Sequence, residues 1–271
     1  GYDPKEVNPK QVSAARLAKG IGNWVRLPYN GVNSSVGQYR RIMPVRFPSI
    51  PGFDLAGEVT EVGAHVTRFK PGDRIFAMLD RRPGGTSAEY AAVGERAAAR
   101  MPANLAPQEA AAIPLAGLTA LQCLRDLGRI ASGKRVLIIG ASGGVGHLAV
   151  QIAKSYGANV TAVCSGRNAE RMLRLGADRA VDYTQASDLH GPQPYDLVLD
   201  LIAQSPLRRL LALLAADGVY VSSLPSASRI AAVLLLPLVS RRRVRIAGVK
   251  PRGVDLEELS RLCEAGKLRP V

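Results

Sequence analysis

Residues 135–163, RVLIIGASGGVGHLAVQIAKSYGANVTAV, predict the fold of the second half of this chain. The stretch begins with a branched apolar run, typical of a parallel strand that is buried on both faces. A glycine-rich turn follows, and then a run that places Leu148, Ile152 and Ala153 on one side of a helix. We expect Gly157 to end this helix and NVTAV to form the next strand. Such a strand–turn–helix–strand unit presents backbone N–H groups where a phosphate can bind.

The turn matches the fingerprint G-x-G-x-x-G, with alanine in the first position. Gly143 would let the backbone approach a pyrophosphate, and Gly146 would let the helix pack close to the strand. The fingerprint alone is weak evidence, but here it lies between a strand and a helix, as it requires. The alternative is a glycine turn that serves only tight packing. We predict a dinucleotide site at Ala141, Ser142, Gly143, Gly144, Val145 and Gly146.

The residues after the second strand indicate which dinucleotide binds. An NAD site usually has Asp or Glu about 20 residues further on, where it binds the ribose 2′-hydroxyl. This chain has Cys164-Ser165-Gly166-Arg167 there, without an acid. Since a guanidinium pairs with phosphate through a planar fork, Ser165 and Arg167 favour the 2′-phosphate of NADPH. The alternative for Arg167 is a solvated side chain near a helix start, although a cation there opposes the helix dipole.

Composition limits the class of protein. The chain has 271 residues, 47% of them hydrophobic, which is enough for two modest domains. Its three cysteines are far apart and odd in number, which favours a reducing, cytoplasmic compartment over a disulfide framework. No secretory signal pattern is present at the N-terminus. The longest apolar run, Ile230–Val239, contains Pro237 and is too short to span a membrane.

The net charge of +14 raises nucleic acid as a candidate partner. Only Arg241, Arg242, Arg243 and Arg245 form a cluster, however, and no nucleic-acid-binding motif accompanies them. We therefore expect no nucleic-acid partner. Attraction of an anionic cofactor, or simply a solvated arginine-rich surface, explains the charge better.

The segment from Trp24 to Met101 has the pattern of a β-domain. Short strands separated by Pro-Gly turns predict a partly open β-barrel. Residues 1–23 lack a clear period and are interpreted as an N-terminal arm or as holding a short helix from Val12 to Lys19. The strands expected here are residues 57–63, 73–78 and 87–93.

After Pro107 the pattern changes to alternating helices and strands. Residues 108–127 predict a helix that bends or breaks at Pro114. The alternation after Lys134 predicts a doubly wound parallel sheet, and a last helix is expected from Asp255 to Ala265, capped by Gly266. The later strands expected are residues 180–183, 195–200, 218–222 and 244–249.

Three motifs of this chain resemble the medium-chain dehydrogenase/reductase superfamily, most of all its zinc-independent quinone oxidoreductase branch. They are FPSIPGFDLAGEVTEVGAHVTRFKPGDRIFAM, AAAIPLAGLTAL and GASGGVGHLAVQIAKSYGANV. The resemblance implies a GroES-like catalytic domain, residues 24–107, and a Rossmann NADPH-binding domain, residues 108–250. Residues 251–271 would begin the return to the catalytic domain. The implied activity is NADPH-dependent reduction of a quinone or of a carbon–carbon double bond next to a carbonyl.

We expect this hydride transfer to be metal-free. Zinc-dependent relatives carry Gly-His-Glu where this chain has Gly52-Phe53-Asp54, and they have a cysteine-rich lobe that is missing here. A catalytic zinc needs about three protein ligands, and the chain's three histidines lack ligand spacing. The short-chain reductase alternative needs Lys four residues after Tyr, and none of the eight tyrosines has one.

The resemblance also implies residues near the nicotinamide and the substrate. Asn33 would lie beside both, and Thr119 would contact the nicotinamide end. Tyr39 and Arg40 would hydrogen-bond a substrate oxygen, and Tyr183 would flank the 2′-phosphate. Each has a structural alternative, such as a turn for Asn33, packing for the tyrosines and solvation for Arg40.

Two departures from the family favour an alternative function. Relatives often have an acid where this chain has Val36, and they continue beyond the position of Val271 with further strands and a helix. The alternative is a non-catalytic NADPH-binding subunit or a lapsed enzyme. Attachment to a membrane surface through Ile230–Val239 and the arginines that follow is a third alternative. The identity of the quinone or enone has no sequence signature.

We also expect a homodimer. Residues 244–249 are predicted to form the last strand of the parallel sheet, and an edge strand is open to pairing. By resemblance, two copies would join there about a twofold axis. Arg241, Arg242 and Arg243 would then have to avoid their copies or find acidic partners.

Overall fold

The chain divides into two compact units, each described here by itself. The first comprises Gly1–Leu115 and Lys250–Arg261, and the second comprises Ala116–Val249 and Leu262–Val271. The division is therefore close to the change in sequence pattern after Pro107. The structure is a computed structural model, and it describes residues 14–17, 50–79, 84–185, 189 and 191–271.

The first unit is built on a five-stranded antiparallel sheet in the order β4-β1-β2-β3-β5. Leu55, Ile75 and Ala91 are among the residues of its apolar core. The short strands agree with the predicted β-domain. Their bounds are β1 (Ala14–Leu17), β2 (Asp54–Val59), β3 (Arg74–Met78), β4 (Tyr90–Ala92) and β5 (Ala98–Arg100).

Two expectations for this unit need correction. A helix from Val12 to Lys19 is wrong, because Ala14–Leu17 forms strand β1, which pairs with both β2 and β4. Such a short Ala-rich segment carries no local strand signal, and its neighbours in the sheet decide its conformation. The strand expected over residues 57–63 lies at Asp54–Val59, so it begins three residues earlier and ends four residues earlier than predicted.

Short helical segments complete the first unit. They include η4 (Glu95–Ala97), α2 (Pro107–Ala110) and the start of α8 (Gly253–Glu264). Arg68 bonds the carboxylate of Glu257 on α8, and its other terminal nitrogen donates to the carbonyl of Glu95 at 3.0 Å. A Cβ on Gly253 would lie 2.5 Å from the carbonyl oxygen of Ala98, so only glycine allows the start of α8 to approach β5 this closely.

The second unit is built on a six-stranded sheet whose strands all pair in parallel, in the order β11-β10-β9-β6-β7-β8. The predicted doubly wound sheet is thus confirmed, and strand 195–200 has the predicted bounds. The others differ from expectation by a few residues at their ends. The bounds are β6 (Arg135–Ile139), β7 (Asn159–Cys164), β8 (Arg179–Asp182), β9 (Tyr195–Asp200), β10 (Leu214–Ser222) and β11 (Arg243–Ile246).

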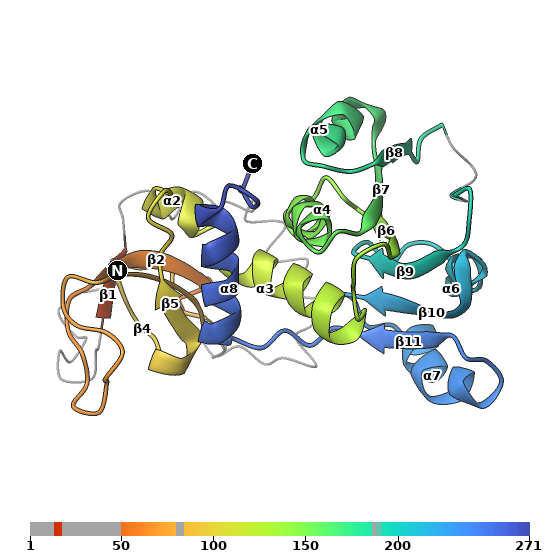
Figure 1. The fold of residues 1–271 in the computed structure, drawn as a ribbon. Coiled ribbons are helices and arrows are strands. Elements are labelled where there is room, and N and C mark those ends of the chain that lie inside the picture. Colours follow the sequence, from red (N-terminus) through yellow and green to blue (C-terminus); the bar gives the residue numbers. More distant parts are fainter. Residues whose placement is uncertain (1–13, 18–49, 80–83, 186–188, 190) are drawn as a thin grey trace. The chain divides into compact units, whose positions relative to one another are not determined.

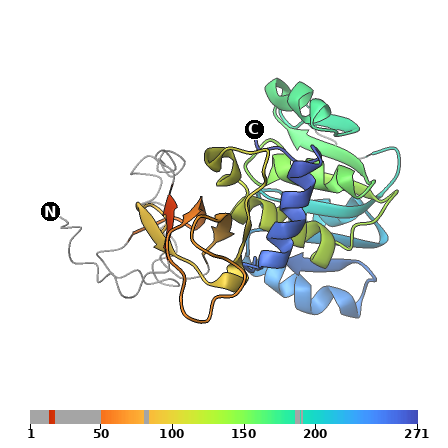
Figure 2. The same cartoon turned by 60° about the vertical axis from the view of Figure 1, so that its left-hand side comes forward.

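The helices of this unit lie against the sheet, with α5 beside β8 at one end and α7 beside β11 at the other (Figures 1 and 2). Gly157 (φ 76°) ends α4, and Gly266 (φ 68°) follows α8, as predicted. The break at Pro114 is confirmed, because α3 begins there. The helical segments are α3 (Pro114–Gln122), the π-helical η5 (Cys123–Leu127), α4 (Gly146–Ser155), η6 (Gly166–Asn168), α5 (Ala169–Arg174), α6 (Leu207–Ala212), α7 (Ala227–Leu235) and η7 (Leu236–Leu238).

Among the described residues, no helix combines the length and the apolar character that crossing a membrane requires. Cys123, Cys164 and Cys263 are buried, and none of them forms a disulfide bond.

Candidate dinucleotide site

The glycine-rich turn lies where the winding of the parallel sheet reverses. From β6 the chain builds β7 and β8 on one side and then returns to place β9 on the other side of β6. In open α/β sheets, ligands bind at the carboxyl ends of the strands at such a switch point. The turn after β6 is therefore at the position that the architecture provides for a ligand.

Three glycines give this turn its shape. Gly140 has φ 83°, a left-handed conformation that side chains other than glycine rarely adopt. A Cβ on Gly146 would lie 2.2 Å from the carbonyl oxygen of Gly140 and 2.6 Å from that of Ala141, so the start of α4 packs on the turn only because it is glycine. A Cβ on Gly144 would meet nothing within 4 Å, which leaves that side of the turn open.

The turn also carries unpaired backbone donors. No described residue accepts a hydrogen bond from the N–H groups of Ser142, Gly144 or Val145, although Gly143 donates to Gly140 at 3.1 Å. These groups stand at the start of the ten-residue helix α4, where the helix dipole favours negative charge. The arrangement is suited to a pyrophosphate.

His147, in the first turn of α4, contacts the backbone of the glycine-rich turn through its side chain. Its Nδ1 lies 3.0 Å from the carbonyl oxygen of Gly143, and its Nε2 accepts from the N–H of Val271 at 3.4 Å. These partners fit a neutral ring with the proton on Nδ1. Burial lowers the pKa of His147, and the charge of Arg171 lowers it further, so the fold favours the neutral form. No spacing in the sequence indicates this role of His147.

Ser165 and Arg167 follow the carboxyl end of β7, as predicted. Asn168 donates from Nδ2 to the Ser165 hydroxyl at 3.0 Å, which anchors the short helix η6. Arg167 is exposed on η6, and no described residue forms an ion pair or hydrogen bond with its guanidinium. Tyr183 lies in the turn after β8 and is 62% exposed. The guanidinium is thus available to an anionic ligand.

Asp182 is a carboxylate near this end of the site that the sequence did not reveal. It ends β8 and pairs in register with Cys164, the last residue of β7. It accepts from the backbone N–H of Thr184 at 2.9 Å and from its hydroxyl at 2.8 Å. These bonds, with a weaker one from the N–H of Gly166, hold the pKa of Asp182 below its usual range. A Cβ on Gly166 would lie 2.4 Å from the carboxylate, so the acid is pressed against the backbone of η6.

A buried ionic cluster holds the loop after β9. Asp200 is 1% exposed and accepts from the N–H groups of Ile202 and Ala203 at 3.1 and 2.8 Å. Its other oxygen accepts from the Tyr220 hydroxyl at 2.7 Å and lies 3.3 Å from Arg229. The side chain of Ile202 would lie 2.8 Å from a Cβ on Gly140, so this loop packs directly on the glycine-rich turn. The cluster therefore positions one wall of the site.

The remaining predicted residues lie outside this turn. Thr119 lies partly buried on α3. Asn33, Tyr39 and Arg40 lie outside the described residues. Their roles stay predictions.

In the first unit, Asp54 is the acid of Gly52-Phe53-Asp54, which the family resemblance compares with Gly-His-Glu of zinc-dependent relatives. Its carboxylate accepts from the N–H of Leu115 in the first turn of α3 at 2.5 Å. Burial raises the pKa of Asp54 to about 6, against a smaller lowering by this hydrogen bond. Asp54 thus anchors a helix start from a distant strand. No group of three His, Cys, Asp or Glu that could hold a metal ion occurs among the described residues.

Comparison with known proteins identifies the family. Residues 23–103 match the alcohol dehydrogenase GroES-like domain, and residues 144–260 match the zinc-binding dehydrogenase family. A chloroplast envelope quinone oxidoreductase homolog of Arabidopsis thaliana is 37% identical over 246 residues, which are 87% of this chain and 74% of that protein. The chain belongs to the medium-chain dehydrogenase/reductase superfamily.

Further relatives of this medium-chain dehydrogenase/reductase support the same family. A 2-methylene-furan-3-one reductase of Solanum lycopersicum is 35% identical over 83% of this chain and 56% of that protein. The quinone oxidoreductase of Coxiella burnetii superposes with a TM-score of 0.77 at 28% identity, over 95% of this chain and 78% of that one. The names of several plant and animal relatives place them in chloroplasts or mitochondria, and the cytoplasmic location stays a prediction.

Family membership makes the protein an oxidoreductase with a nicotinamide dinucleotide cofactor. The residues present fit that group. The glycine contacts leave no room for a side chain at Gly146. Three backbone N–H groups of the turn and the guanidinium of Arg167 have no partner among the described residues. The second unit of this medium-chain dehydrogenase/reductase therefore holds the main features that a dinucleotide needs.

Proposed function

We propose that this protein transfers a hydride from NADPH, without a metal, to a quinone or an α,β-unsaturated carbonyl compound. The observation that carries the proposal is the glycine-rich turn at the switch point of the sheet, whose N–H groups at Ser142, Gly144 and Val145 have no partner in the part of the chain that the structure describes. The bound nicotinamide would supply the hydride, and the protein would supply orientation and polar contacts.

The preference for NADPH rests on charge. Arg167 would form a charge-assisted pair with the 2′-phosphate, and the Ser165 hydroxyl would add a hydrogen bond. Asp182 opposes this preference, because a carboxylate near a phosphate repels it. Its bonds to Thr184 and Gly166 occupy the carboxylate, which supports a structural role for this acid.

The choice of acceptor rests on the relatives and on the absence of a strong electrophilic catalyst from the predicted site. The names of the relatives connect them with quinones and with a methylene-furanone, whose double bond is conjugated to a ketone. In these acceptors the electron pair of the hydride ends on an oxygen that needs only modest hydrogen bonding. We propose that Asn33, Tyr39, Arg40 and Thr119 orient the nicotinamide and bind that oxygen, as the family resemblance implies.

Two assays with the purified protein test the proposal. The first follows oxidation of NADPH with a panel of quinones, enones and simple ketones. The second follows reduction of NADP⁺ with simple alcohols. We expect turnover with at least one quinone or enone and negligible reaction with ketones and alcohols. Asn33→Ala should lower kcat more than it weakens NADPH binding, because its contact matters most as charge develops on the acceptor. A folded protein that binds NADPH but reduces none of the panel would support the alternative of a non-catalytic NADPH-binding subunit.

A further inference from the structure

Two side chains on one face of helix α4 hold a segment of the second unit that is distant in sequence. His147 and Gln151 are four residues apart, so they are neighbours on the helix surface. Both are buried, with exposed fractions of 4% and 7%. They bind residues 269–271, which follow α8 and the buried Leu268. We call His147 and Gln151 the α4 clamp.

Gln151 binds the backbone of Arg269 through both of its polar groups. Its Oε1 accepts from the N–H of Arg269 at 2.9 Å, and its Nε2 donates to the carbonyl oxygen of Arg269 at 2.9 Å. The same Nε2 donates to the carbonyl oxygen of His147 at 3.0 Å. The side-chain amide thus uses its oxygen and both of its N–H bonds, which fixes its orientation.

His147 connects the same segment to the glycine-rich turn. Its Nε2 accepts from the N–H of Val271 at 3.4 Å, and its Nδ1 lies 3.0 Å from the carbonyl oxygen of Gly143. Pro270 has no N–H, so both backbone donors of residues 269–271 bind the α4 clamp. One imidazole ring therefore bonds the turn on one side and the docked segment on the other.

The bond to Gly143 decides where the next N–H group of the turn points. The carbonyl oxygen of Gly143 accepts from the backbone N–H of His147 at 3.1 Å and also faces the ring. In a trans peptide the C=O and the following N–H point in opposite directions, so the N–H of Gly144 points away from that ring. This N–H has no acceptor among the described residues, and a Cβ on Gly144 would meet nothing within 4 Å. The α4 clamp thus aims a backbone donor toward the open side of the turn.

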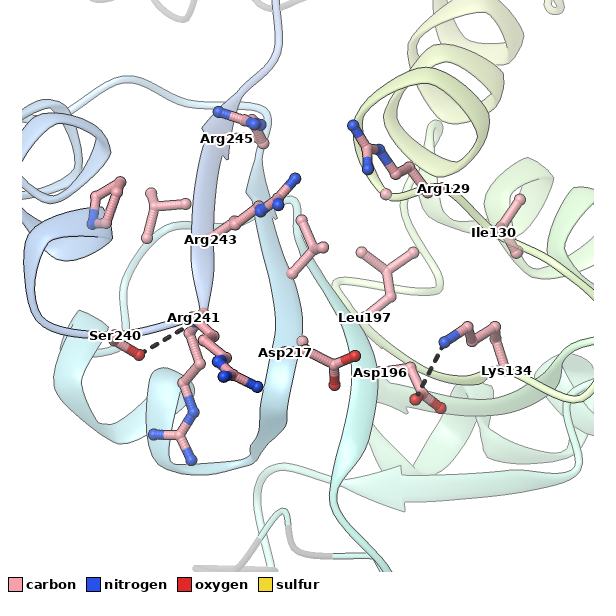
Figure 3. Close-up of a pocket in the computed structure, with 16 residues that line it drawn as sticks. Arg129, Ile130, Lys134, Asp196, Leu197, Asp217, Ser240, Arg241, Arg243 and Arg245 are labelled. Atoms are coloured by element: carbon pink, nitrogen blue, oxygen red, sulfur yellow. Dashed lines mark hydrogen bonds and ion pairs between the residues drawn. The ribbon is translucent and has the colours of Figure 1, made fainter.

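The strand that leads into the turn is held at its other end. Figure 3 shows Lys134 pointing to Asp196, with its Nζ 3.5 Å from the carboxylate. The backbone N–H of Arg135 donates to the same carboxylate at 2.8 Å, so the start of β6 is fixed to β9. The contacts that shape the turn are therefore those at its own end of β6, and the α4 clamp is one of them.

We propose that His147 and Gln151 are positioning residues for the dinucleotide. They dock residues 269–271 on α4 and fix the Gly143 peptide, and in this way they hold the N–H groups of the turn toward the pyrophosphate. Docking of the segment and binding of the dinucleotide are then coupled, so that each stabilises the other. The proposal rests on the proposed function only for the dinucleotide site, and it is independent of the acceptor and of the choice between NADPH and NADH.

The alternative is a role in stability alone, because buried polar groups need hydrogen-bond partners in any protein. In that case a substitution in the α4 clamp lowers the free energy of unfolding but leaves the affinity of the folded protein for a dinucleotide unchanged. The two roles therefore differ in the dissociation constant of a folded variant, and NADP⁺ is the probe that measures it.

Two substitutions at His147 separate these roles. Asparagine places its Nδ2 where histidine has Nδ1, so His147→Asn keeps a donor for the carbonyl oxygen of Gly143 and loses only the acceptor for Val271. His147→Leu removes both bonds. We expect His147→Leu to weaken NADP⁺ binding about fivefold or more and His147→Asn to stay within about twofold of the unaltered protein. Calorimetric titration of the whole chain measures these affinities.

Gln151→Met tests the docking of the segment. Methionine has a similar length without polar groups, so the N–H and the carbonyl of Arg269 lose their partner on α4. We expect NADP⁺ to bind about threefold more weakly or worse, and the amide of Arg269 to exchange its hydrogen faster. By linkage, NADP⁺ should slow this exchange in the unaltered protein and slow it less in Gln151→Met. Hydrogen exchange followed by NMR measures this amide.

Ser155→Ala is the matched control on the same helix. Its hydroxyl donates to the carbonyl oxygen of Ile152 at 2.7 Å, at the opposite end of α4 from the turn. The variant thus loses a bond from a side chain to the backbone without changing the α4 clamp. It should bind NADP⁺ as the unaltered protein does. Circular dichroism and thermal unfolding would confirm that every variant is folded at the temperature of the titration.

Three results would overturn the proposal. One is an unchanged affinity for NADP⁺ in folded His147→Leu and Gln151→Met, and another is an equal loss of affinity in Ser155→Ala. The third is an amide of Arg269 whose exchange NADP⁺ does not slow in the unaltered protein. The proposed reaction fails separately, since a protein that shows the expected NADP⁺ affinities but reduces no quinone or enone would refute the reaction and support the positioning role.

Discussion

At the scale of single residues, Arg167 is the strongest test of the cofactor. Its guanidinium is exposed on η6 and has no ionic partner among the described residues. A hydrogen bond to a charged group contributes about 1.5–3 kcal/mol. We therefore predict that Arg167→Ala weakens NADPH binding about tenfold or more and leaves NADH binding nearly unchanged. Calorimetric titration with both dinucleotides measures this, and equal affinities in the unaltered protein would contradict it.

The matched variant is Asp182→Asn. Asparagine keeps an oxygen that accepts from the N–H of Thr184, but it removes the negative charge next to Gly166. It should therefore strengthen the binding of NADPH more than that of NADH. A loss of binding to both dinucleotides would mean that the carboxylate holds η6 in place, and the comparison with Arg167→Ala would separate the two roles.

Asp54 gives a prediction about pH and stability. Its pKa is about 6 in the folded chain and 3.8 as the reference, so the folded state binds more protons in this range. The contribution of Asp54 to stability is thus fully present below about pH 4 and is lost as the pH rises through about 6. Asp54→Asn should raise the free energy of unfolding at pH 7 by about 1–3 kcal/mol relative to the unaltered protein, with little difference at pH 4. Urea unfolding of both proteins at pH 4 and pH 7 measures the free energies of unfolding. An equal effect of the substitution at the two pH values would refute the prediction.

The residues of the glycine-rich turn were predictable because their spacing is local. Position 146 must be glycine because a Cβ there would clash with the backbone of Gly140 and Ala141, which are only five or six residues away in the sequence. Asp182 and Asp200 were missed, because their neighbours come from adjacent strands and not from adjacent positions. Tyr195–Asp200 could be predicted as a strand, but its sequence does not indicate that its last residue, Asp200, belongs to a buried ionic cluster.

At the scale of elements, the sequence predicted those helices and strands whose conformation depends on their own residues and not on distant partners. The buried strand β6 has a continuous apolar run, β7 and β9 are mostly apolar, and glycine ends α4 where the sequence indicates. Strand β1 could not be predicted, because Ala14–Leu17 is a strand only by pairing with β2 and β4. The exposed leucines of α7 could not be placed either. Its 3.6-residue period fits an apolar face on either side, and the buried Arg229 decides the orientation.

That buried arginine predicts how α7 depends on the sheet. Arg229→Met would leave Asp200 charged at 1% exposure without its cationic partner. Removing one member of a buried ion pair costs about 3–5 kcal/mol, so we expect a loss of stability in that range. Combining Arg229→Met with Asp200→Asn should recover part of the loss, because no uncompensated charge remains. Chemical denaturation of the single and double variants measures it, and a double variant that is less stable than the two losses added would contradict the pairing.

At the scale of the whole molecule, the arginines of the edge strand β11 oppose the pairing of two copies that its open edge allows. Strand β11 is an edge of the six-stranded sheet, so its outer backbone groups are available to a second copy. We predict a twofold homodimer joined there at micromolar concentration. Pairing would bring Arg243 and Arg245 of the two copies together, so the dimer should become tighter as salt screens their repulsion. Light scattering across a salt series measures this trend, and a monomer at every salt concentration would exclude the dimer.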